Sequence, residues 1–434
     1  MTAGSRVLVV GAGGREHALV VALHDSPQHP AVFAAPGNAG MEPDATRLPF
    51  AATDVEGITG WALREHPDLV VVGPEMSLAA GLADALRAEG IPTLGPGRAG
   101  ARLETSKTYA KEVFERLGLP TARARIVRDA AEAKRALDGV SWPLVIKADG
   151  LAAGKGVVIA RDRAEAEATV RSWMERGALG EAGRTLLLEE FLEGEELSLT
   201  VLTDGERWLL FPLSRDHKRV GDGDTGPNTG GMGTYAPSGV LGGEEALALA
   251  GSLADPVLAE MRRLGAPYRG VLYFGLMMTR GGPRVLEINA RFGDPETQVM
   301  LPLVAEDAFD LLLRAARGAI PAERHRSIVR HHGAAVCVVL ASAGYPGAPR
   351  TGVAIEGLDR DRPHGIHVFH AGVDRASGRW ITTGGRVLGI TARAETLELA
   401  REAAYSVASG IRFDGMHYRR DIALSPIGTG GSRP

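Results

Sequence analysis

The first hundred residues alternate between short apolar runs and helix-like segments, and this alternation constrains the fold more than any other feature of the chain. Strands are expected over 6–10, 31–35, 68–73 and 91–95, and a helix over 78–89. Strands that alternate with helices form parallel sheets, whose ligands bind at the carboxyl ends of the strands. We therefore expect an α/β parallel sheet with a ligand site in the loops that follow the strands.

The loop after the first strand, Gly11-Ala-Gly-Gly-Arg-Glu-His17, is rich in glycine and leads into a helix. Backbone N–H groups at a helix N-terminus bind anions. The dinucleotide fingerprint requires a third glycine where this chain has Glu16, and the acidic residue expected after the second strand is missing. Asn38 and Glu75 follow the second and third strands instead. A nicotinamide cofactor is disfavoured, and a smaller phosphate-bearing ligand is expected; ordinary turn chemistry is the alternative for any one of these residues.

Charge and composition exclude some classes of binding partner. The net charge is −4 and no basic tract stands out, which argues against nucleic acid. No run approaches the roughly 20 apolar residues of a membrane span, and no signal peptide precedes the first strand. The single cysteine, Cys337, lies in an apolar run and is expected to be a buried small hydrophobe. We expect a cytoplasmic protein without a membrane partner.

Two lysines in the middle of the chain are candidates for anion binding. Lys107 stands in the first turn of a helix that Thr105 or Ser106 can cap, where its charge opposes the helix dipole. Lys147 ends the apolar strand 144–147, although a surface salt bridge is the default for one such lysine. The glycine-rich segment 148–157 departs from the Walker A spacing. It resembles a mobile hairpin that folds over phosphates.

Two further segments give weaker evidence for a ligand site. The strand 185–192 ends at an acidic connection, 193–196, which could bind a nucleotide but is more often a solvated turn. The stretch 214–237 has six glycines between Gly221 and Gly233 and is expected to be a long irregular loop. Its charged residues suggest an anion clamp, with disorder as the competing interpretation.

A hairpin is expected from 270–278 and 284–290, with Met277 opposite Glu287. Strand side chains alternate with period two, so Glu287, Asn289 and Arg291 project from one face. Carboxylate and amide oxygens suit Mg²⁺, and a guanidinium suits a carboxylate or phosphoryl group. An exposed strand face with a surface charge pair is the alternative.

Together these segments resemble the ATP-grasp superfamily and, more narrowly, the phosphoribosylamine–glycine ligase family. The long strings that carry the resemblance run from Gly11 to Gln298: Gly11-Ala-Gly-Gly-Arg-Glu-His17, Pro36-Gly-Asn-Ala-Gly40, Val72-Gly-Pro-Glu75, Lys147-Ala-Asp-Gly-Leu-Ala-Ala-Gly-Lys-Gly156, Asp216-His-Lys-Arg-Val-Gly221, Asp224-Thr-Gly-Pro-Asn-Thr-Gly-Gly-Met-Gly233 and Arg291-Phe-Gly-Asp-Pro-Glu-Thr-Gln298. Glu-x-Asn-x-Arg is shared with biotin carboxylase-like enzymes, whereas the continuation after Arg291 is more specific.

The resemblance implies an α/β fold with three parts and a short tail. These are an N-terminal Rossmann-like parallel-sheet domain (1–103), a central ATP-grasp domain of two α+β subdomains (104–324, with a mobile lid at about 121–192), a small β-rich C-terminal domain (325–425) and a flexible tail (426–434). In the last domain, strands are expected over 333–342, 367–373 and 385–391 and a helix over 394–409. His367 and His370 fall on opposite faces of a strand, which argues against a metal site there.

The resemblance also implies the site residues. The ligands of Mg²⁺ or Mn²⁺ are expected at Glu287 and Asn289. ATP contacts are expected at Lys107, Lys147, Gly154, Lys155, Gly156, Glu189, Glu190, Phe191, Leu192 and Glu196. Substrate contacts are expected at Gly13, Gly14, Arg15, Glu16, Asn38, Pro74, Glu75 and Gly293. The catalytic centre is expected at Asp216, Lys218, Arg291 and Asp294.

The implied function is the ATP-dependent ligation of glycine to phosphoribosylamine through glycyl phosphate, by a monomer. Its products are glycinamide ribonucleotide, ADP and phosphate. Such a reaction needs positioning and charge neutralisation more than a protein nucleophile. The alternatives are another ATP-grasp carboxylate–amine ligase and a catalytically silent nucleotide-binding protein.

Overall fold

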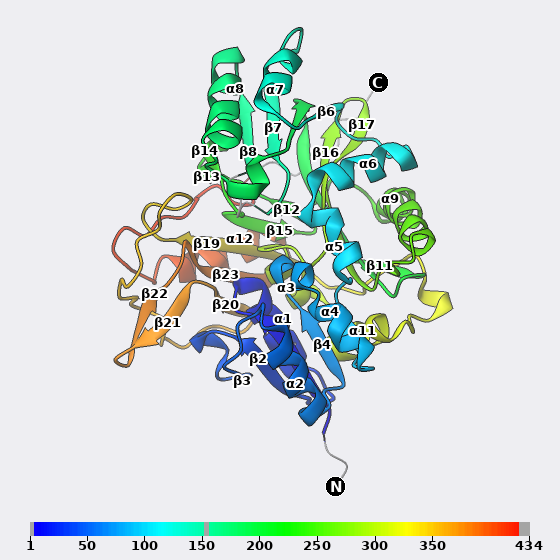
Figure 1. The fold of residues 1–434 in the computed structure, drawn as a ribbon. Helices are drawn as coiled ribbons and strands as arrows, with labels where there is room; N and C mark the ends of the chain where they lie inside the picture. Colours follow the sequence, from blue (N-terminus) through cyan, green and yellow to red (C-terminus); the bar gives the residue numbers. More distant parts are fainter. Residues whose placement is uncertain (1–3, 152–155, 425–434) are drawn as a thin grey trace.

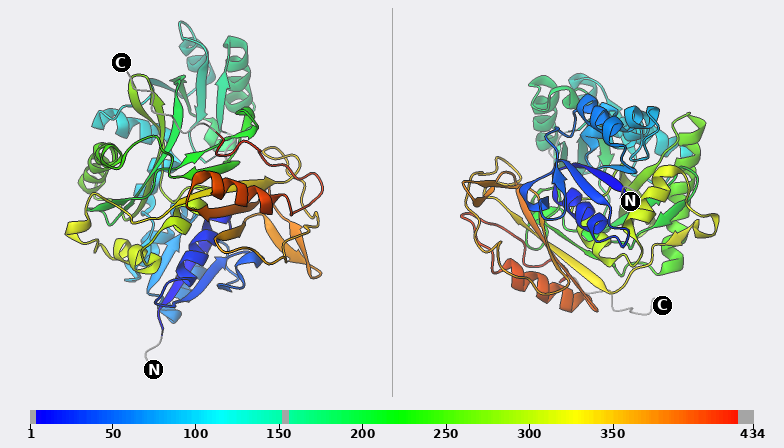
Figure 2. Two further views of the ribbon diagram at one scale, coloured as in Figure 1. Left: turned by 180° about the vertical axis from the view of Figure 1, so that it is seen from behind. Right: turned by 90° about the horizontal axis from the view of Figure 1, so that it is seen from below.

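The computed structural model describes residues 4–151 and 156–424, and Figures 1 and 2 show them as a single body built on several sheets. The tail predicted at 426–434 lies outside these residues. The predicted α/β class is confirmed: a parallel sheet comes first, antiparallel sheets follow, and the last part is rich in strands. Among the described residues, none of the helices has the length and apolar character that crossing a membrane requires.

The N-terminal sheet is parallel, as predicted, with the strand order β3-β2-β1-β4-β5. Its strands are β1 (Arg6–Gly11), β2 (Ala31–Pro36), β3 (Thr46–Arg47), β4 (Leu69–Val72) and β5 (Thr93–Leu94), and its helices are α1 (Gly14–His24), α2 (Val55–Glu65), α3 (Glu75–Ala80) and α4 (Leu82–Ala88). The single helix predicted over 78–89 was wrong. Gly81, at φ 88°, divides it into α3 and α4, because this left-handed conformation suits glycine and ends a helix.

The central sheet has the order β17-β16-β10-β11-β18. Its strands are β10 (Glu195–Thr203), β11 (Trp208–Leu210), β16 (Gly270–Thr279), β17 (Gly282–Asn289) and β18 (Ser327–Ile328); the neighbouring helices are α5 (Arg98–Thr105), α6 (Lys107–Leu117), α9 (Gly243–Arg263), α10 (Thr297–Leu303) and α11 (Ala308–Arg317). The predicted hairpin is β16–β17, but its predicted register was wrong. Gly275, not Met277, lies opposite Glu287, because the chain reverses at Arg280 and Gly281, directly after Thr279 and before Gly282. A bulge at Leu286 then shifts the pairing by one residue.

A four-stranded sheet stands apart from the rest of the molecule at the top of Figure 1. Its order is β6 (Ala124–Val127), β9 (Leu186–Glu190), β7 (Leu144–Ala148) and β8 (Val157–Ala160), and it carries α7 (Ala130–Ala136) and α8 (Arg163–Val170). These elements have a hydrophobic core of their own, which includes Ile146, Leu188 and Val170. The sheet and its two helices are therefore a separately packed part of the fold.

The third five-stranded sheet, β12-β15-β19-β23-β20, combines distant parts of the chain. Its strands are β12 (Arg215–Asp216), β15 (Gly233–Ala236), β19 (Ala334–Ala341), β20 (Ile366–His370) and β23 (Arg386–Ala394); α12 (Leu397–Ala408) and the hairpins β13–β14 (Arg219–Gly221, Thr225–Asn228) and β21–β22 (Val373–Ala376, Arg379–Thr382) accompany it. The irregular loop predicted over 214–237 was wrong, because this segment forms four short strands. Cys337 is fully buried in β19, as expected.

Candidate active site

A cavity of about 680 Å³ lies where the four-stranded sheet faces the central sheet. Most of the predicted site residues line it: Glu75, Lys107, Lys147, Gly156, Glu189, Glu190, Phe191, Leu192, Glu196, Asp216, Lys218, Glu287, Asn289, Arg291, Gly293 and Asp294. The remaining described ones are Gly13, Gly14, Arg15, Glu16, Asn38 and Pro74, which do not line it. Gly154 and Lys155 lie outside the described residues. The fold thus brings together side chains that are spread over more than two hundred positions of the sequence.

Glu287 and Asn289 end strand β17 on the cavity wall, one on each side of Ile288. Glu287 Oε1 lies 3.7 Å from Lys218 Nζ and 3.4 Å from Asn289 Nδ2. Burial alone would raise the pKa of Glu287, but the positive charges of Lys218, Lys147 and Lys107 outweigh it and lower the pKa to about 2. This carboxylate is ionised at neutral pH and faces a ring of cations.

The donor atoms fit a hard cation that is shared with a phosphate. Glu287 and Asn289 offer carboxylate and amide oxygens, the ligand type that Mg²⁺ and Mn²⁺ take. The described residues hold no group of three or more His, Cys, Asp or Glu side chains that could enclose a metal by themselves. Mg²⁺ typically binds through one or two protein oxygens and completes its shell with water and phosphate, so this sparse set suits it.

Lys147 is part of a buried ion-pair network, and the surface salt bridge considered for it was wrong. Its Nζ lies 2.6 Å from Glu189 Oε2 and donates to Leu286 O at 3.1 Å. Leu286 is the extra residue of the β17 bulge, so the bulge aims this carbonyl at the lysine. Lys111 Nζ lies 2.6 Å from the other Glu189 oxygen. Sequence reasoning missed Lys111, because nothing in its helix marks it as more than a surface residue.

Helix α6 begins at Lys107, and Ser106 caps it as predicted, by accepting from the Tyr109 N–H. Asp149 accepts from the Thr108 N–H at 3.1 Å and from the Thr108 hydroxyl at 2.7 Å. Lys107 Nζ donates to Gly150 O at 3.3 Å. Asp149 and Gly150 thus fasten the start of the glycine-rich segment to the N-terminus of α6.

Arg291 follows β17 and is held by two carboxylates from the N-terminal part of the chain. Its guanidinium lies 2.9 Å from Glu104 Oε1 and 3.4 Å from Glu75 Oε2. The charge of Arg291 lowers the pKa of Glu75 against the opposing effect of burial, whereas burial raises the pKa of Glu104. Glu104 also accepts the Ala290 N–H at 2.7 Å. Glu104 was not predicted, because its partners lie 186 residues away.

An acidic pair, Asp216 and Glu296, lies at one end of the cavity. Glu296 is 3 % exposed and accepts from the Tyr273 hydroxyl at 2.7 Å. Burial, followed by the negative charge of Glu296, raises the pKa of Asp216 well above its usual value. Among the described residues, neither carboxylate has a cation within ion-pair distance, whereas Lys218 Nζ lies 3.1 Å from Glu196. This end of the cavity is suited to a small cation such as an ammonium group.

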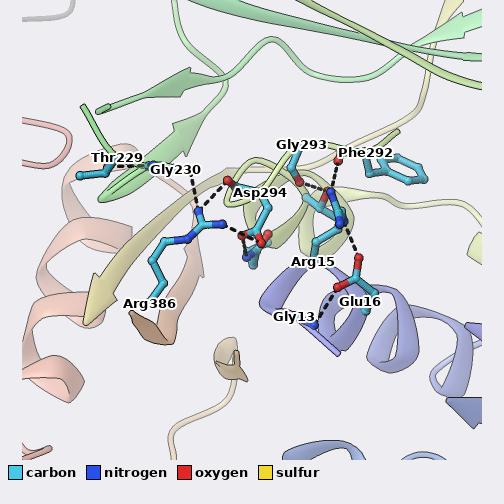
Figure 3. A network of polar contacts seen from close by, with 12 residues as sticks. Gly13, Arg15, Glu16, Thr229, Gly230, Phe292, Gly293, Asp294 and Arg386 are labelled. Carbon is cyan, nitrogen blue, oxygen red and sulfur yellow. Dashed lines mark hydrogen bonds and ion pairs between the residues drawn. The ribbon is translucent and has the colours of Figure 1, made fainter. Parts of the chain in front are cut away.

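Arg386 is the first residue of β23, in the sheet β12-β15-β19-β23-β20, which we call the C-terminal sheet. It binds Asp294, as Figure 3 shows. Arg386 Nη2 lies 3.0 Å from Asp294 Oδ2, and Nη1 donates to Asp294 O at 2.7 Å and to Gly230 O at 2.5 Å. The charge of Arg386 lowers the pKa of Asp294 despite its burial. Sequence reasoning missed Arg386, which follows two glycines in a segment with no other charged residue nearby.

The glycine loop lies on the other side of Asp294 (Figure 3). Arg15 donates to Phe292 O at 3.1 Å and pairs with Glu16, which accepts the Gly13 N–H at 2.7 Å. The Glu16 carboxylate therefore makes its contacts within the loop itself. Asn38 is used similarly: it donates to Ala12 O at 2.8 Å and to His370 O at 2.9 Å, and it accepts the Gly40 N–H. Both side chains shape the loop.

The connection after β9 forms the cavity rim. Glu190 pairs with Arg123 at 2.9 Å, and Phe191 and Leu192 line the cavity. Phe191 is 38 % exposed. Its exposure leaves an apolar face against which a flat ring could lie.

Three family models match nearly the whole chain. They are described as the phosphoribosylglycinamide synthetase N domain (residues 5–104), ATP-grasp (A) domain (105–297) and C domain (335–425). The phosphoribosylamine–glycine ligase of Caulobacter vibrioides is 49 % identical over 417 residues, which cover 96 % of this chain and 97 % of that protein. The enzyme of the same name from Phenylobacterium zucineum is 46 % identical and covers 97 % of this chain and 99 % of that protein.

Two solved structures have folds similar to the fold of this chain. The crystal structure of phosphoribosylamine–glycine ligase from Thermotoga maritima is 36 % identical, has a TM-score of 0.83, and covers 96 % of this chain and 100 % of that chain. The biotin carboxylase domain of the Hydrogenobacter thermophilus 2-oxoglutarate carboxylase, in complex with magnesium ADP and bicarbonate, has a TM-score of 0.73 at 21 % identity and covers 95 % and 91 % of the two chains. The second likeness shows the shared fold alone.

Proposed function

Since this chain belongs to the phosphoribosylamine–glycine ligase family, we propose that its cavity is where ATP, glycine and phosphoribosylamine react. The activity is the ATP-dependent ligation of glycine and phosphoribosylamine in purine biosynthesis. The observation that carries the placement is the group of three lysines, Lys107, Lys147 and Lys218, whose charges converge on the carboxylate of Glu287. A triphosphate that bound there would replace repulsion among the lysines with charge-assisted hydrogen bonds.

ATP is proposed to lie between the four-stranded sheet and the central sheet. Its base would rest against the rim formed by Glu190, Phe191 and Leu192, and Glu196 would accept from its ribose. Its phosphates would extend toward Lys107 and Lys147. Segment 150–156 begins beside Lys107 Nζ, from where it could cover the phosphates; this role includes Gly154 and Lys155 and stays a prediction.

Glu287 and Asn289 would hold Mg²⁺ or Mn²⁺ together with phosphate oxygens. Bound there, the ion would neutralise charge on the transferred phosphoryl group. Glu287 is suited to this task because the surrounding lysines keep its pKa low, so that the carboxylate is ionised at neutral pH.

The reaction is proposed to proceed in two displacements. An oxygen of the glycine carboxylate attacks the γ-phosphorus and ADP leaves, which gives glycyl phosphate. The amine nitrogen of phosphoribosylamine then attacks the carbonyl carbon, phosphate leaves, and the nitrogen loses a proton. Arg291, fixed by Glu104 and Glu75, would orient the carboxylate, while Lys218 would stabilise the phosphoryl oxygens. Asp216 would hold the glycine ammonium group.

Phosphoribosylamine is proposed to enter from the glycine-loop side of Asp294. The backbone N–H of Gly14 stands at the start of α1, a position that favours a phosphate, and Gly13 precedes it in the glycine loop. Arg15, Glu16, Asn38 and Pro74 would support this loop, and Gly293 and Asp294 would face the ribose. Because Glu16 and Asn38 are satisfied internally, we expect their side chains to act by shaping the loop.

We propose matching roles for the parts of the chain. Residues 1–103 bind phosphoribosylamine, and residues 104–324 bind ATP and carry out phosphoryl transfer, with 121–192 closing over the nucleotide. Residues 325–425 support the loop after β17 that contains Asp294, here called the reaction loop, through Arg386. We expect the protein to act as a monomer, and size-exclusion chromatography with light scattering tests this.

The test is a measurement of ADP formation with each substrate omitted in turn. We expect sustained ADP release over many turnovers only when glycine and phosphoribosylamine are both present, with product mass equal to glycinamide ribonucleotide. ADP release with another acid and amine would point to a different ligase of the superfamily. Nucleotide binding without turnover on a panel of acids and amines would identify a silent nucleotide-binding protein.

A further inference from the structure

A lysine that does not belong to the predicted set, Lys111, shares one buried carboxylate with Lys147. Lys111 Nζ lies 2.6 Å from Glu189 Oε1, and Lys147 Nζ lies 2.6 Å from Glu189 Oε2. The three residues are 3 %, 9 % and 3 % exposed in the order Lys111, Lys147 and Glu189, so water screens these contacts weakly. The carboxylate uses one oxygen for each lysine.

Each lysine also has anchors that fix it in place. Lys111 donates to Thr121 Oγ1 at 2.8 Å and to Ala122 O at 3.0 Å, at the start of the lid segment. Lys147 donates to Leu286 O at 3.1 Å, on the β17 bulge. Two cations in a nearly closed pocket are costly unless both are paired, and a single carboxylate with two oxygens pairs both.

The charge of this cluster has a consequence for the cavity. Two lysines and one carboxylate leave one net positive charge beside the residues that face Glu287. Burial would raise the pKa of Glu189, but Lys147 and Lys111 outweigh it and lower the pKa, so the carboxylate is ionised. Without Lys111, Glu189 would offset the whole charge of Lys147, and the cluster would be neutral.

We propose that Lys111 is a positioning residue that keeps the positive charge of Lys147 available to the phosphates of a bound nucleotide. It does so by binding Oε1 of Glu189 while Lys147 binds Oε2, so that Glu189 orients Lys147 without neutralising the cluster. The inference rests on the proposed nucleotide role of the cavity. It assigns Glu189 a part through its side chain contacts with two lysines, and not through contact with ATP.

The test compares two ligands on the full chain, ADP and adenosine, by calorimetric titration. Lys111→Met should weaken ADP binding roughly tenfold to a hundredfold, the range for losing one charge-assisted contact. Adenosine lacks phosphates, so its affinity should stay within about twofold, the usual scatter of independent changes. If Lys111 were only a brace for the lid, both ligands would weaken together, and that result would overturn the proposal.

The double variant Lys111→Met/Glu189→Gln restores the single positive charge of the cluster and removes the carboxylate that needed two partners. We expect it to recover ADP affinity to within about twofold of the parent. A double variant that binds ADP more than tenfold more weakly than the parent overturns the proposal, also in the case that Lys111→Met alone does not fold. Lys134→Met, which breaks an exposed pair with Glu175 on the lid, is the matched control and should change neither affinity.

Failure of the proposed function is recognised separately. If the parent protein bound neither ADP nor ATP, the nucleotide role of the cavity would be wrong. If the parent bound ADP and Lys111→Met bound it equally well, only the role of Lys111 would be wrong.

Discussion

Glu287 is the side chain on which the metal and the phosphoryl chemistry are proposed to depend. Glu287→Gln keeps the shape and the oxygen donor but removes the negative charge that would balance a divalent cation. We expect turnover to fall roughly a thousandfold or more, because a bound metal supplies several kcal/mol of charge stabilisation. The measurement is the rate of ADP formation at saturating ATP, glycine and phosphoribosylamine.

A control for that variant is Glu181→Gln, which removes a carboxylate from an exposed pair with Arg184. It should leave turnover unchanged, since exposed ion pairs contribute little. A Glu287→Gln enzyme with parental turnover, or one that reached half-maximal activity at the same magnesium concentration as the parent, would contradict the placement of the metal.

Individual residues were predictable where the local pattern was informative. The period of a strand placed Glu287 and Asn289 on one face, and the cavity contains both. Glu104, Lys111, Glu296 and Arg386 were not predicted. Arg386 donates to Gly230 across 156 positions, and no spacing rule connects residues that far apart. Partners of this kind are defined only once the sheets have assembled.

At the scale of elements, the contact between the 3₁₀ turn Ala39–Met41 and β20 is unusually close. A Cβ on Gly40 would overlap the ring of His370. Gly40→Ala should therefore lower stability by about 1–3 kcal/mol, the cost of overpacking, and thermal unfolding should begin several degrees lower. Gly60→Ala in α2 is the matched control: its nearest neighbour is an arginine side chain at 3.6 Å, so helix propensity should leave it neutral or stabilise it.

The histidines at this contact also make the stability of the folded protein depend on pH. Burial lowers the pKa of His370 to about 4 and that of His17, whose Nδ1 accepts the His370 N–H, to about 3. An unfolded histidine titrates near 6.5, so below that pH the unfolded state binds more protons and stability decreases with acidification.

His370→Phe tests this dependence, because it keeps a ring but removes one titrating group. Between pH 7.5 and 5, one such histidine should cost the parent about 2 kcal/mol, so the variant should lose less stability than the parent over that interval. The measurement is the urea unfolding midpoint at each pH. Equal slopes for the two proteins would show that His370 is not the titrating group.

The types of the helices and strands were predicted better than their breaks and bulges. The parallel sheet, the β16–β17 hairpin and the strands of the C-terminal part followed from alternation and apolar runs. The break at Gly81 and the bulge at Leu286 did not, since a glycine in a helical pattern and an extra strand residue leave no clear signal. The bulge nevertheless aims the carbonyl that Lys147 uses.

At the scale of the whole molecule, Arg386 connects the C-terminal sheet to the reaction loop at Asp294. Arg386→Lys retains the charge but cannot donate to Gly230 O, Asp294 O and the Asp294 carboxylate at once. We expect kcat to fall about tenfold to a hundredfold, the range for lost orienting contacts, with ADP affinity unchanged. Arg393→Lys, which alters one contact to Pro302 O, should leave kcat unchanged. A parental kcat for Arg386→Lys would contradict a coupling of this sheet to the chemistry.

The sheet that contains β12 and β15 is completed only by β19, where Gly233 pairs with Val338. During synthesis the edge of β15 therefore leaves the ribosome well before its partner strand exists. At roughly 5–20 residues per second this interval is on the order of ten seconds. The nascent chain spends that time with open backbone N–H and C=O groups, a state prone to pairing with other chains. The sheet that holds Arg386 against Asp294 can accordingly form only after β19 and β23 have been made, late in the synthesis of the chain.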